Sequence, residues 1–356
     1  MEITTELKSK IETPKSTMEV FWIPILFLGT LLVLALIVRI CGQDPRLALG
    51  ELWRGSFGSL GGLAAIAARA LILIFYALGI VLSFRGGMLN IGTEGQARMG
   101  AAAATALSLG SCGMFLSSMP LVGKAALLLA GALAGACWSL IAGLLRHWRG
   151  VPEVISTLML NYVALQAVKY LVGNPALLQG GSSYPQSDPL PQALQLRLWA
   201  GTEFHSGVFL ALPVVLLFHV FLFSTPSGFY IRAMGLNPTA ARGCGIPVAR
   251  LGLLSFAVAG ALSGFAGTLG VLALGRLGKD PTYPDYGFMA IAVALVADLK
   301  PIWVLPSAIL FAGLEVGAKS MQASAHISDS VVYAIEGLVI LAILVRGVQV
   351  FKHANA

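Results

Sequence analysis

Residues 125–145 read AALLLAGALAGACWSLIAGLL, a stretch without any charged residue that lies between Lys124 and Arg146. A single helix needs about 20 mostly apolar residues to cross the hydrocarbon core of a bilayer. Nearly uncharged runs also cover Val20 to Val38, Ala101 to Leu109 and Val208 to Phe223. These apolar residues come in blocks rather than in amphipathic stripes, which predicts transmembrane helices.

The composition indicates the same class of protein. Of the 356 residues, 57% are hydrophobic and 11% are charged, whereas a soluble globular chain carries about 25% charged residues. We therefore expect an all-α, polytopic membrane protein. Counting apolar blocks between charged or Gly/Pro-rich breaks predicts about ten spans: 20–38, 62–83, 88–110, 125–145, 152–173, 207–224, 251–274, 287–299, 301–320 and 331–346.

The basic residues predict the orientation of the chain. They occur singly between apolar blocks, with no basic stripe and no interleaved aromatic residues, so the net charge of +7 does not indicate nucleic-acid binding. The positive-inside rule instead places both termini in the cytoplasm. Residues 1–19 are then a cytoplasmic segment, 20–346 the membrane domain with a cytoplasmic loop at 225–250, and 347–356 a cytoplasmic tail. No A-x-A cleavage site follows the first apolar run, so we expect a retained anchor.

Nothing in the sequence predicts an enzyme or a metal site. Residues 313–320 read GLEVGAKS, but a phosphate-binding loop needs its lysine directly after the second glycine, and Ala318 intervenes. The four cysteines and five histidines show no metal-binding spacing. Glycines recur four residues apart, as in Gly131 with Gly135 and Gly260 with Gly264, which indicates close helix packing in lipid.

Polar residues inside the predicted spans are the candidates for a transport pathway, because a charge in the bilayer is costly and usually faces a cavity or a partner. They are Arg69, Asn90, Glu94, Gln96, Arg98, Asn161, Asp298, Glu315 and Glu336. Residues 85–96, RGGMLNIGTEGQ, form a polar, glycine-rich start to an apolar span. Such an interruption is tolerated only where it is buried in protein or lines a wet cavity.

For Asn90, Glu94 and Asn161 a pathway role and a structural role are equally compatible with the sequence. Glu94 and Arg98 stand four residues apart, so on a helix they can neutralise each other. Arg69 has no explanation at this level.

The polar segment after the sixth span predicts a short surface helix. It runs through Gly235, Asn237 and Pro238 to Gly245, and Asn-Pro is a favourable N-cap and first-turn pair. The helix should begin at that pair and end near Gly243 or Gly245. A short helix between two spans is a plausible docking element, although an ordinary loop would also fit.

Three stretches carry a resemblance to a known family: residues 85–96, residues 152–168 (PEVISTLMLNYVALQAV) and residues 232–247 (RAMGLNPTAARGCGIP). The sequence resembles the ABC transporter permeases of the branched-chain amino acid, ribose and simple-sugar type. Within them it is most similar to the nucleoside-uptake branch that works with basic-membrane-protein-type binding lipoproteins. The similarity runs from about residue 60 to 347.

The resemblance implies ten helices in two inverted halves, a second permease subunit that makes a heterodimer, two cytoplasmic ATPases and an extracytoplasmic binding lipoprotein. It implies ATP and Mg²⁺ on the ATPases and no cofactor in this chain. The loop resembles a coupling helix of the pattern E-A-A-x-x-x-G, in which Thr239 replaces the acidic residue. The resemblance assigns coupling to the ATPases to six residues of this loop: Gly235, Asn237, Thr239, Ala240, Ala241 and Gly245.

The expected substrate site, near the bilayer centre, comprises Asn90, Glu94, Gln96 and Asn161. The expected function is nucleoside import across the cytoplasmic membrane. A simple-sugar importer is the alternative, and an ion-coupled secondary transporter is a more distant one that the coupling-helix resemblance disfavours.

Overall fold

A computed structural model describes residues 44–174, 184–199, 201–279 and 285–325, with a few single positions nearer the two ends. The described part is helical, and its only β-pairing consists of two isolated bridges. The chain divides into two compact units, Met1–Gly55 with Gly317–Ala356, and Ser56–Val316. The predicted segments 1–19 and 347–356, the spans 20–38 and 331–346, and Glu336 lie outside the described residues.

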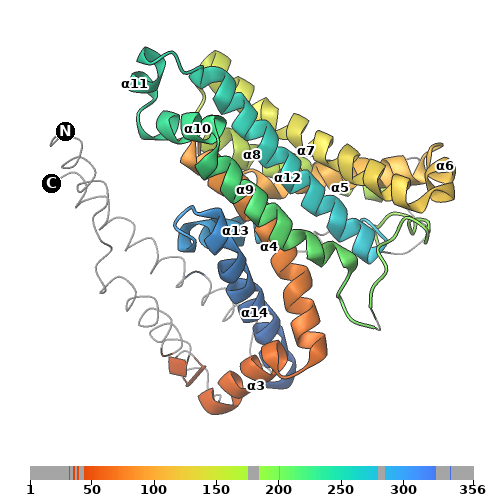
Figure 1. Ribbon diagram of the computed structural model, residues 1–356. Helices are drawn as coiled ribbons and strands as arrows, with labels where there is room; N and C mark the ends of the chain where they lie inside the picture. Colours follow the sequence, from red (N-terminus) through yellow and green to blue (C-terminus); the bar gives the residue numbers. More distant parts are fainter. Residues whose placement is uncertain are drawn as a thin grey trace. The chain divides into compact units, whose positions relative to one another are not determined.

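The helices of the structure are shown in Figure 1. They are α3 (Pro45–Phe57), α4 (Leu60–Arg85), α5 (Thr93–Leu109), α6 (Gly113–Ser118), α7 (Pro120–Arg149), α8 (Glu153–Gly173), the 3₁₀-helix η1 (Ser206–Leu210), α9 (Ala211–Ser224), α10 (Pro226–Leu236), α11 (Pro238–Gly243), α12 (Val248–Leu274), α13 (Tyr286–Val296) and α14 (Pro301–Ala325).

Local sequence signals set several of these boundaries. The Ser59 hydroxyl accepts a hydrogen bond from the Gly62 amide and caps α4, and Thr225 caps α10 in the same way. α7 starts with Pro120 and ends at Gly150, whose left-handed backbone suits a residue without a Cβ. These signals place helix ends close to the predicted breaks.

Six described helical segments are long and apolar enough to cross a membrane: α4, α7, α8, η1 with α9, α12 and α14. They confirm the predicted spans at 62–83, 125–145, 152–173, 207–224, 251–274 and 301–320. The segment predicted as span 287–299 is the eleven-residue helix α13, which is too short to cross a bilayer alone. It ends early because Asp298 and Leu299 adopt left-handed backbone angles.

α4 lies at the centre of the unit Ser56–Val316. Of its most apolar stretch 89% is buried, against 28% for α7, 28% for α8 and 17% for η1 with α9. It contacts α12, α13, α9 and α10. The exposed faces of α7, α8 and α9 are therefore the ones left for lipid or for other subunits.

Glycines bring α5, α7 and α12 into backbone contact. A Cβ at Gly264 would overlap the Gly131 carbonyl oxygen, and one at Gly260 would overlap the backbone of Gly135. On α5, a Cβ at Gly100 would meet the same Gly264 backbone. The predicted packing role of the four-residue glycine spacing is thus confirmed.

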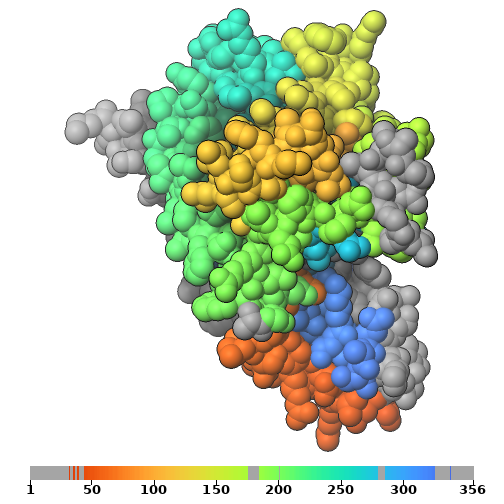
Figure 2. Space-filling model, turned by 90° about the vertical axis from the view of Figure 1, so that its right-hand side faces the viewer, coloured from red at the N-terminus to blue at the C-terminus, as the bar shows by residue number. Residues whose placement is uncertain are grey.

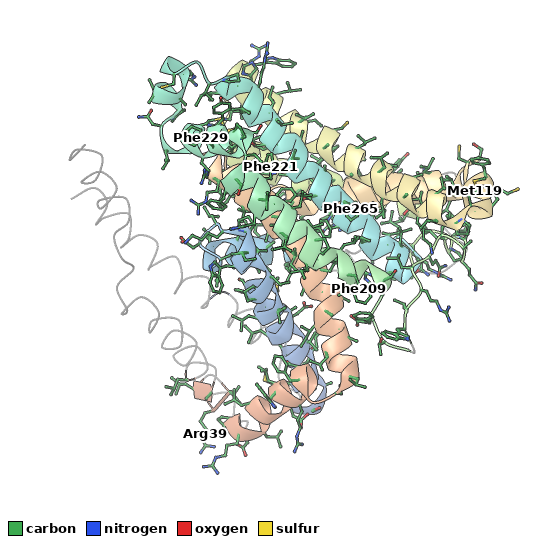
Figure 3. All side chains as sticks on the ribbon, viewed as in Figure 1. Arg39, Met119, Phe209, Phe221, Phe229 and Phe265 are labelled. Atoms are coloured by element: carbon green, nitrogen blue, oxygen red, sulfur yellow. The ribbon has the colours of Figure 1, made fainter. Side chains whose placement is uncertain are left out.

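The two ends of this unit differ in structure. Figure 3 shows Met119 at the corner between α6 and α7, and Phe229 on α10 at the opposite end, beside α11. The first end also holds the segment 184–199, where Leu190 and Leu194 are buried in a cluster with α5, α7, α8 and α12. Figure 2 shows this segment beside the α6–α7 corner. The segment 184–199 is therefore packed against the helices, and backbone bonds such as Leu196 N–H to the Leu272 carbonyl at 2.8 Å hold it.

Candidate functional site

The segment before α5 is irregular, as the glycine-rich stretch at 85–96 predicts. Residues 88–92 are not helical, and side chains of α8 satisfy part of their backbone. The Leu89 amide donates to the Glu153 carboxylate at 3.1 Å, and the Ile91 amide donates to the Thr157 hydroxyl at 3.4 Å. This is how non-helical backbone can be held at membrane depth.

Asn161, on α8, holds the same segment with both ends of its side-chain amide. Its oxygen accepts from the Gly95 amide at 2.8 Å, and its nitrogen donates to the Ile91 carbonyl at 3.0 Å. Asn161 is 9% exposed and does not line the pocket described below.

Asn90 and Gln96 bond mainly to each other. The Gln96 side-chain nitrogen donates to the Asn90 oxygen at 3.0 Å, and the Gly92 amide donates to the same oxygen at 2.9 Å. Both side chains are buried, and neither lines the pocket. Three of the four predicted substrate-binding residues therefore shape the start of α5 in this conformation.

Glu94 is the predicted residue that does line a pocket. Its carboxylate accepts from Arg98 Nη2 at 2.9 Å and from the Gly287 amide, at the start of α13, at 3.1 Å. The expected neutralisation of Glu94 by Arg98 is present, yet it leaves Arg98 Nε buried with no hydrogen-bond partner among the described residues. A guanidinium edge with a spare donor thus borders the cavity beside a carboxylate.

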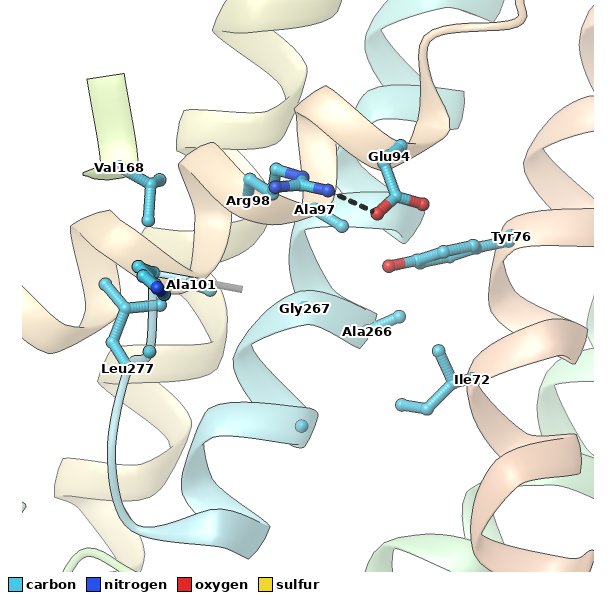
Figure 4. Close-up of a pocket in the computed structure, with 13 residues that line it drawn as sticks. Ile72, Tyr76, Glu94, Ala97, Arg98, Ala101, Val168, Ala266, Gly267 and Leu277 are labelled. Carbon is cyan, nitrogen blue, oxygen red and sulfur yellow. Dashed lines mark hydrogen bonds and ion pairs between the residues drawn. The ribbon is translucent and has the colours of Figure 1, made fainter. Parts of the chain in front are cut away.

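The pocket lies between α4 on one side and α5 with α12 on the other (Figure 4). Tyr76 and Ile72 face it from α4, and Arg98 and Glu94 cross its upper part. Ala266 and other small or apolar residues form much of the remaining wall. The space that a water-sized sphere can reach is about 40 Å³, whereas pockets for small ligands measure about 300–1,000 Å³. The pocket is therefore too small in this structure to hold a ligand of that size.

Sequence reasoning missed most of the pocket lining. Tyr76 and Ile72 belong to a uniformly apolar helix, and no pattern in α4 distinguishes its pocket-facing residues from the rest. Gly267 admits the close approach of α5, since a Cβ there would overlap the Ala97 carbonyl.

The short surface helix predicted after the sixth span is α11. The Asn237 side-chain oxygen accepts from the amides of Thr239 and Ala240, both at 3.0 Å, and the helix ends at Gly243. Thr239, Ala240 and Gly245 are exposed, as a docking face requires. Ala241, which was also expected to contact the ATPase, is instead buried: it is 5% exposed.

Gly235 connects this element to the segment before α5. It ends α10 next to Gly87, whose φ of +71° is left-handed, and a Cβ at Gly235 would overlap the Arg85 carbonyl oxygen. Residues 85–87 lead directly into the irregular segment 88–92. α10, which α11 follows directly, is therefore packed onto the turn that leads into the segment before Glu94.

Comparisons with known proteins agree with these features. The profile of the family described as "Branched-chain amino acid transport system / permease component" matches residues 62–344. The glucose ABC transporter permease protein TsgB13 of Haloferax volcanii is 30% identical over 313 residues, which are 85% of this chain and 80% of the relative.

Two further relatives are named for nucleosides. The guanosine ABC transporter permease protein NupP of Bacillus subtilis is 28% identical over 310 residues, 86% of this chain and 88% of the relative. The nucleoside ABC transporter permease protein NupB of Lactococcus lactis is 29% identical over 324 residues, 88% of this chain and 87% of the relative. The membrane-spanning helices, the irregular segment before α5, the exposed α11 and the matched profile together show that the chain belongs to the family of ABC importer permease components typified by branched-chain amino acid transport systems.

Proposed function

We propose that this permease carries nucleosides, and that they pass through the pocket between α4, α5 and α12. The observation that carries the proposal is the composition of that pocket. One aromatic ring, Tyr76, stands opposite one carboxylate–guanidinium pair, Glu94 with Arg98, and apart from Lys279 the rest of the lining consists of small or apolar residues. Relatives named for guanosine and nucleoside transport support the same substrate class.

The chemistry of a nucleoside fits these groups. A nucleobase presents flat apolar faces, which stack on aromatic side chains, and an edge of donors and acceptors. The spare Arg98 donor would meet an acceptor on that edge, and Glu94 would accept from an N–H or a ribose hydroxyl. A free sugar needs more polar contacts per unit of surface than this lining offers, although the similarity to a glucose permease keeps a simple sugar as the alternative.

The small size of the pocket supports a role for ATP-driven motion. It must widen before a nucleoside can occupy it, and the packing of Gly235 on Gly87 offers a route by which movement of α11 would displace the segment before Glu94. The coupling role of Gly235, Asn237, Thr239, Ala240, Ala241 and Gly245 belongs to this proposal.

The energy would come from other chains. We infer two cytoplasmic ATPases that bind ATP and Mg²⁺, a second permease subunit and an extracytoplasmic binding lipoprotein. The similarity to both guanosine permeases of Bacillus subtilis, NupP and NupQ, supports a heterodimeric permease. The proposed chain has ten spans in two inverted halves, cytoplasmic termini and α11 on the cytoplasmic side of the inner membrane.

Uptake by the reconstituted importer, with its own binding protein, tests the proposal. Radiolabelled guanosine, adenosine or uridine should accumulate inside vesicles in the presence of ATP, and glucose or ribose should not. Tyr76→Leu should lower nucleoside uptake about tenfold, because base stacking contributes about 1–3 kcal/mol. Tyr162→Leu is the matched control, since Tyr162 is 64% exposed on α8. Transport of sugar and not of nucleosides would refute the assignment, and equal uptake by both variants would remove Tyr76 from the pathway.

A further inference from the structure

Arg69 is a charged residue within the apolar helix α4, and its side chain is 11% exposed. Its Nη1 donates to the Glu315 carboxylate on α14 at 3.3 Å. Its Nε and Nη2 donate to the two carboxylate oxygens of Glu203 at 3.4 and 3.3 Å. One guanidinium therefore joins two carboxylates that lie 112 residues apart in the sequence, as the numbers of Glu203 and Glu315 show.

Glu203 stands in a short turn before η1. The Trp199 amide donates to the Phe204 carbonyl at 2.9 Å, and Leu198 and His205 form an isolated bridge, so the turn is closed at its base. Its neighbouring segment also meets the pocket, because Gln186 pairs with Gly278 and the Lys279 amide donates to the Pro185 carbonyl at 3.1 Å. Residues 185 and 186 thus contact Gly278 and Lys279, which line the pocket.

The start of α13 joins this cluster to the pocket. The Tyr286 hydroxyl donates to the Glu315 carboxylate, and the adjacent Gly287 amide donates to the Glu94 carboxylate at 3.1 Å. Tyr286 is 1% exposed and Glu315 is 8% exposed. A continuous series of contacts therefore runs from Glu94 through α13 to Glu315, Arg69 and Glu203.

The two carboxylates hold Arg69 unequally. Glu315 is buried, and separating a buried ion pair leaves an uncompensated charge at high cost. The Glu203 side chain is 49% exposed, and exposed ion pairs are weak and readily replaced by water. When the cluster opens, the Glu203–Arg69 contact is the one that breaks first.

We propose that Glu203 and Arg69 form a releasable latch at the end of the pocket opposite α11, and that Glu315 and Tyr286 are positioning residues linking this latch to Glu94. Closing the latch holds the turn at 201–205 against α4 and restricts access to the pocket. Displacement of Glu94 shifts α13 and weakens the ion pair between Glu315 and Arg69. Occupation of the pocket is therefore coupled to opening of the latch. The latch rests on the proposed function only in treating this pocket as the substrate passage.

Cysteine labelling of the assembled importer without substrate tests the latch independently of the substrate class. All four native cysteines are replaced by alanine, and Ala97→Cys places one thiol in the pocket wall. Outward-facing importer in sealed vesicles then reacts with a membrane-impermeant, charged methanethiosulfonate. Glu203→Gln should raise the labelling rate about two- to fivefold, which corresponds to the loss of one exposed ion pair.

Asp188→Asn is the matched control, because Asp188 is an exposed acid in the same loop region and does not contact Arg69. It should label at the parental rate, and the melting midpoints of all variants should agree within error. An unchanged rate in Glu203→Gln, or an equal rise in both variants, would overturn the latch.

A double-mutant cycle tests the coupling to the pocket. The labelling rate is measured for Glu94→Gln, for Glu203→Gln and for the double variant. The fold-change of the double variant should differ by more than about twofold from the product of the two single fold-changes. In a Tyr286→Phe background, which removes the hydroxyl to Glu315, this difference should vanish. Multiplicative effects in the parental background would refute the link between pocket and latch.

Discussion

Replacing Asn161 by alanine separates a structural role from a direct role in substrate binding. The substitution leaves the Gly95 amide and the Ile91 carbonyl without the partners now at 2.8 and 3.0 Å. Each buried polar group left unpaired costs about 1–3 kcal/mol, so the variant should lose about 2–6 kcal/mol of folding free energy. Both orphaned groups lie in or beside the segment 88–92, and the start of α5 should therefore lose its shape.

The assay is thermal unfolding of the detergent-purified chain, followed by uptake in the reconstituted importer. We expect Asn161→Ala to lower the melting midpoint by several degrees and to lower uptake with it. Asn174→Ala, at the surface end of the same helix, is the control and should change neither. An Asn161→Ala protein that melts like the parent yet fails to transport would refute the structural reading and return Asn161 to the substrate pathway.

Three further outcomes follow from the described packing. Gly264→Val should prevent stable folding, because the side chain meets the backbone of α7, whereas Gly173→Ala should be tolerated since no described residue lies within 4 Å of its Cβ position; size-exclusion chromatography in detergent, where a folded variant elutes as a single symmetric peak, measures both. Ala240→Glu should abolish ATPase stimulation and uptake while leaving the melting midpoint unchanged, whereas Ala241→Glu should also lower that midpoint, because Ala240 is exposed and Ala241 is buried. Burial lowers the pKa of His205. The contribution of its neutral imidazole to loop stability is therefore complete above the ordinary histidine pKa of about 6.5 and declines as the pH falls from there toward the lowered pKa. Proteolysis of the loop should increase as the pH falls over that range, and His205→Gln should remove the pH dependence.

Six of the ten predicted spans match long apolar helices of the described residues, because hydropathy reports length and apolar content directly. The surface helix was predictable too, since Asn237 and Pro238 act through local backbone chemistry. The sequence could not show which residues of α4 face the pocket, because the residues from Ala70 to Leu82 are apolar on every face of that helix. The ion pairs of Arg69 could not be predicted either, since both of its partners are distant in the chain.

The different roles of the polar residues at 90–96 could not be predicted from the sequence either. Asn90, Gln96 and Glu94 are all buried polar groups near one helix start, and their types alone do not distinguish backbone support from pocket lining. The deciding facts are the hydrogen-bond partners, which come from α8 for the segment and from α13 for Glu94.

The glycine contacts among α5, α7 and α12 determine which parts of the unit can move. At these glycines no side chain separates the helices, so sliding or rotation there would drive backbone into backbone, and we expect the three helices to move together. α4 contacts α12 closely where Gly79 meets Ala259, and the pocket begins a turn away, at Tyr76. We therefore expect the pocket to enlarge by movement of α4 relative to α5 and α12, and the end of α4 that carries Arg69 is farther from the Gly79–Ala259 contact than Tyr76 is.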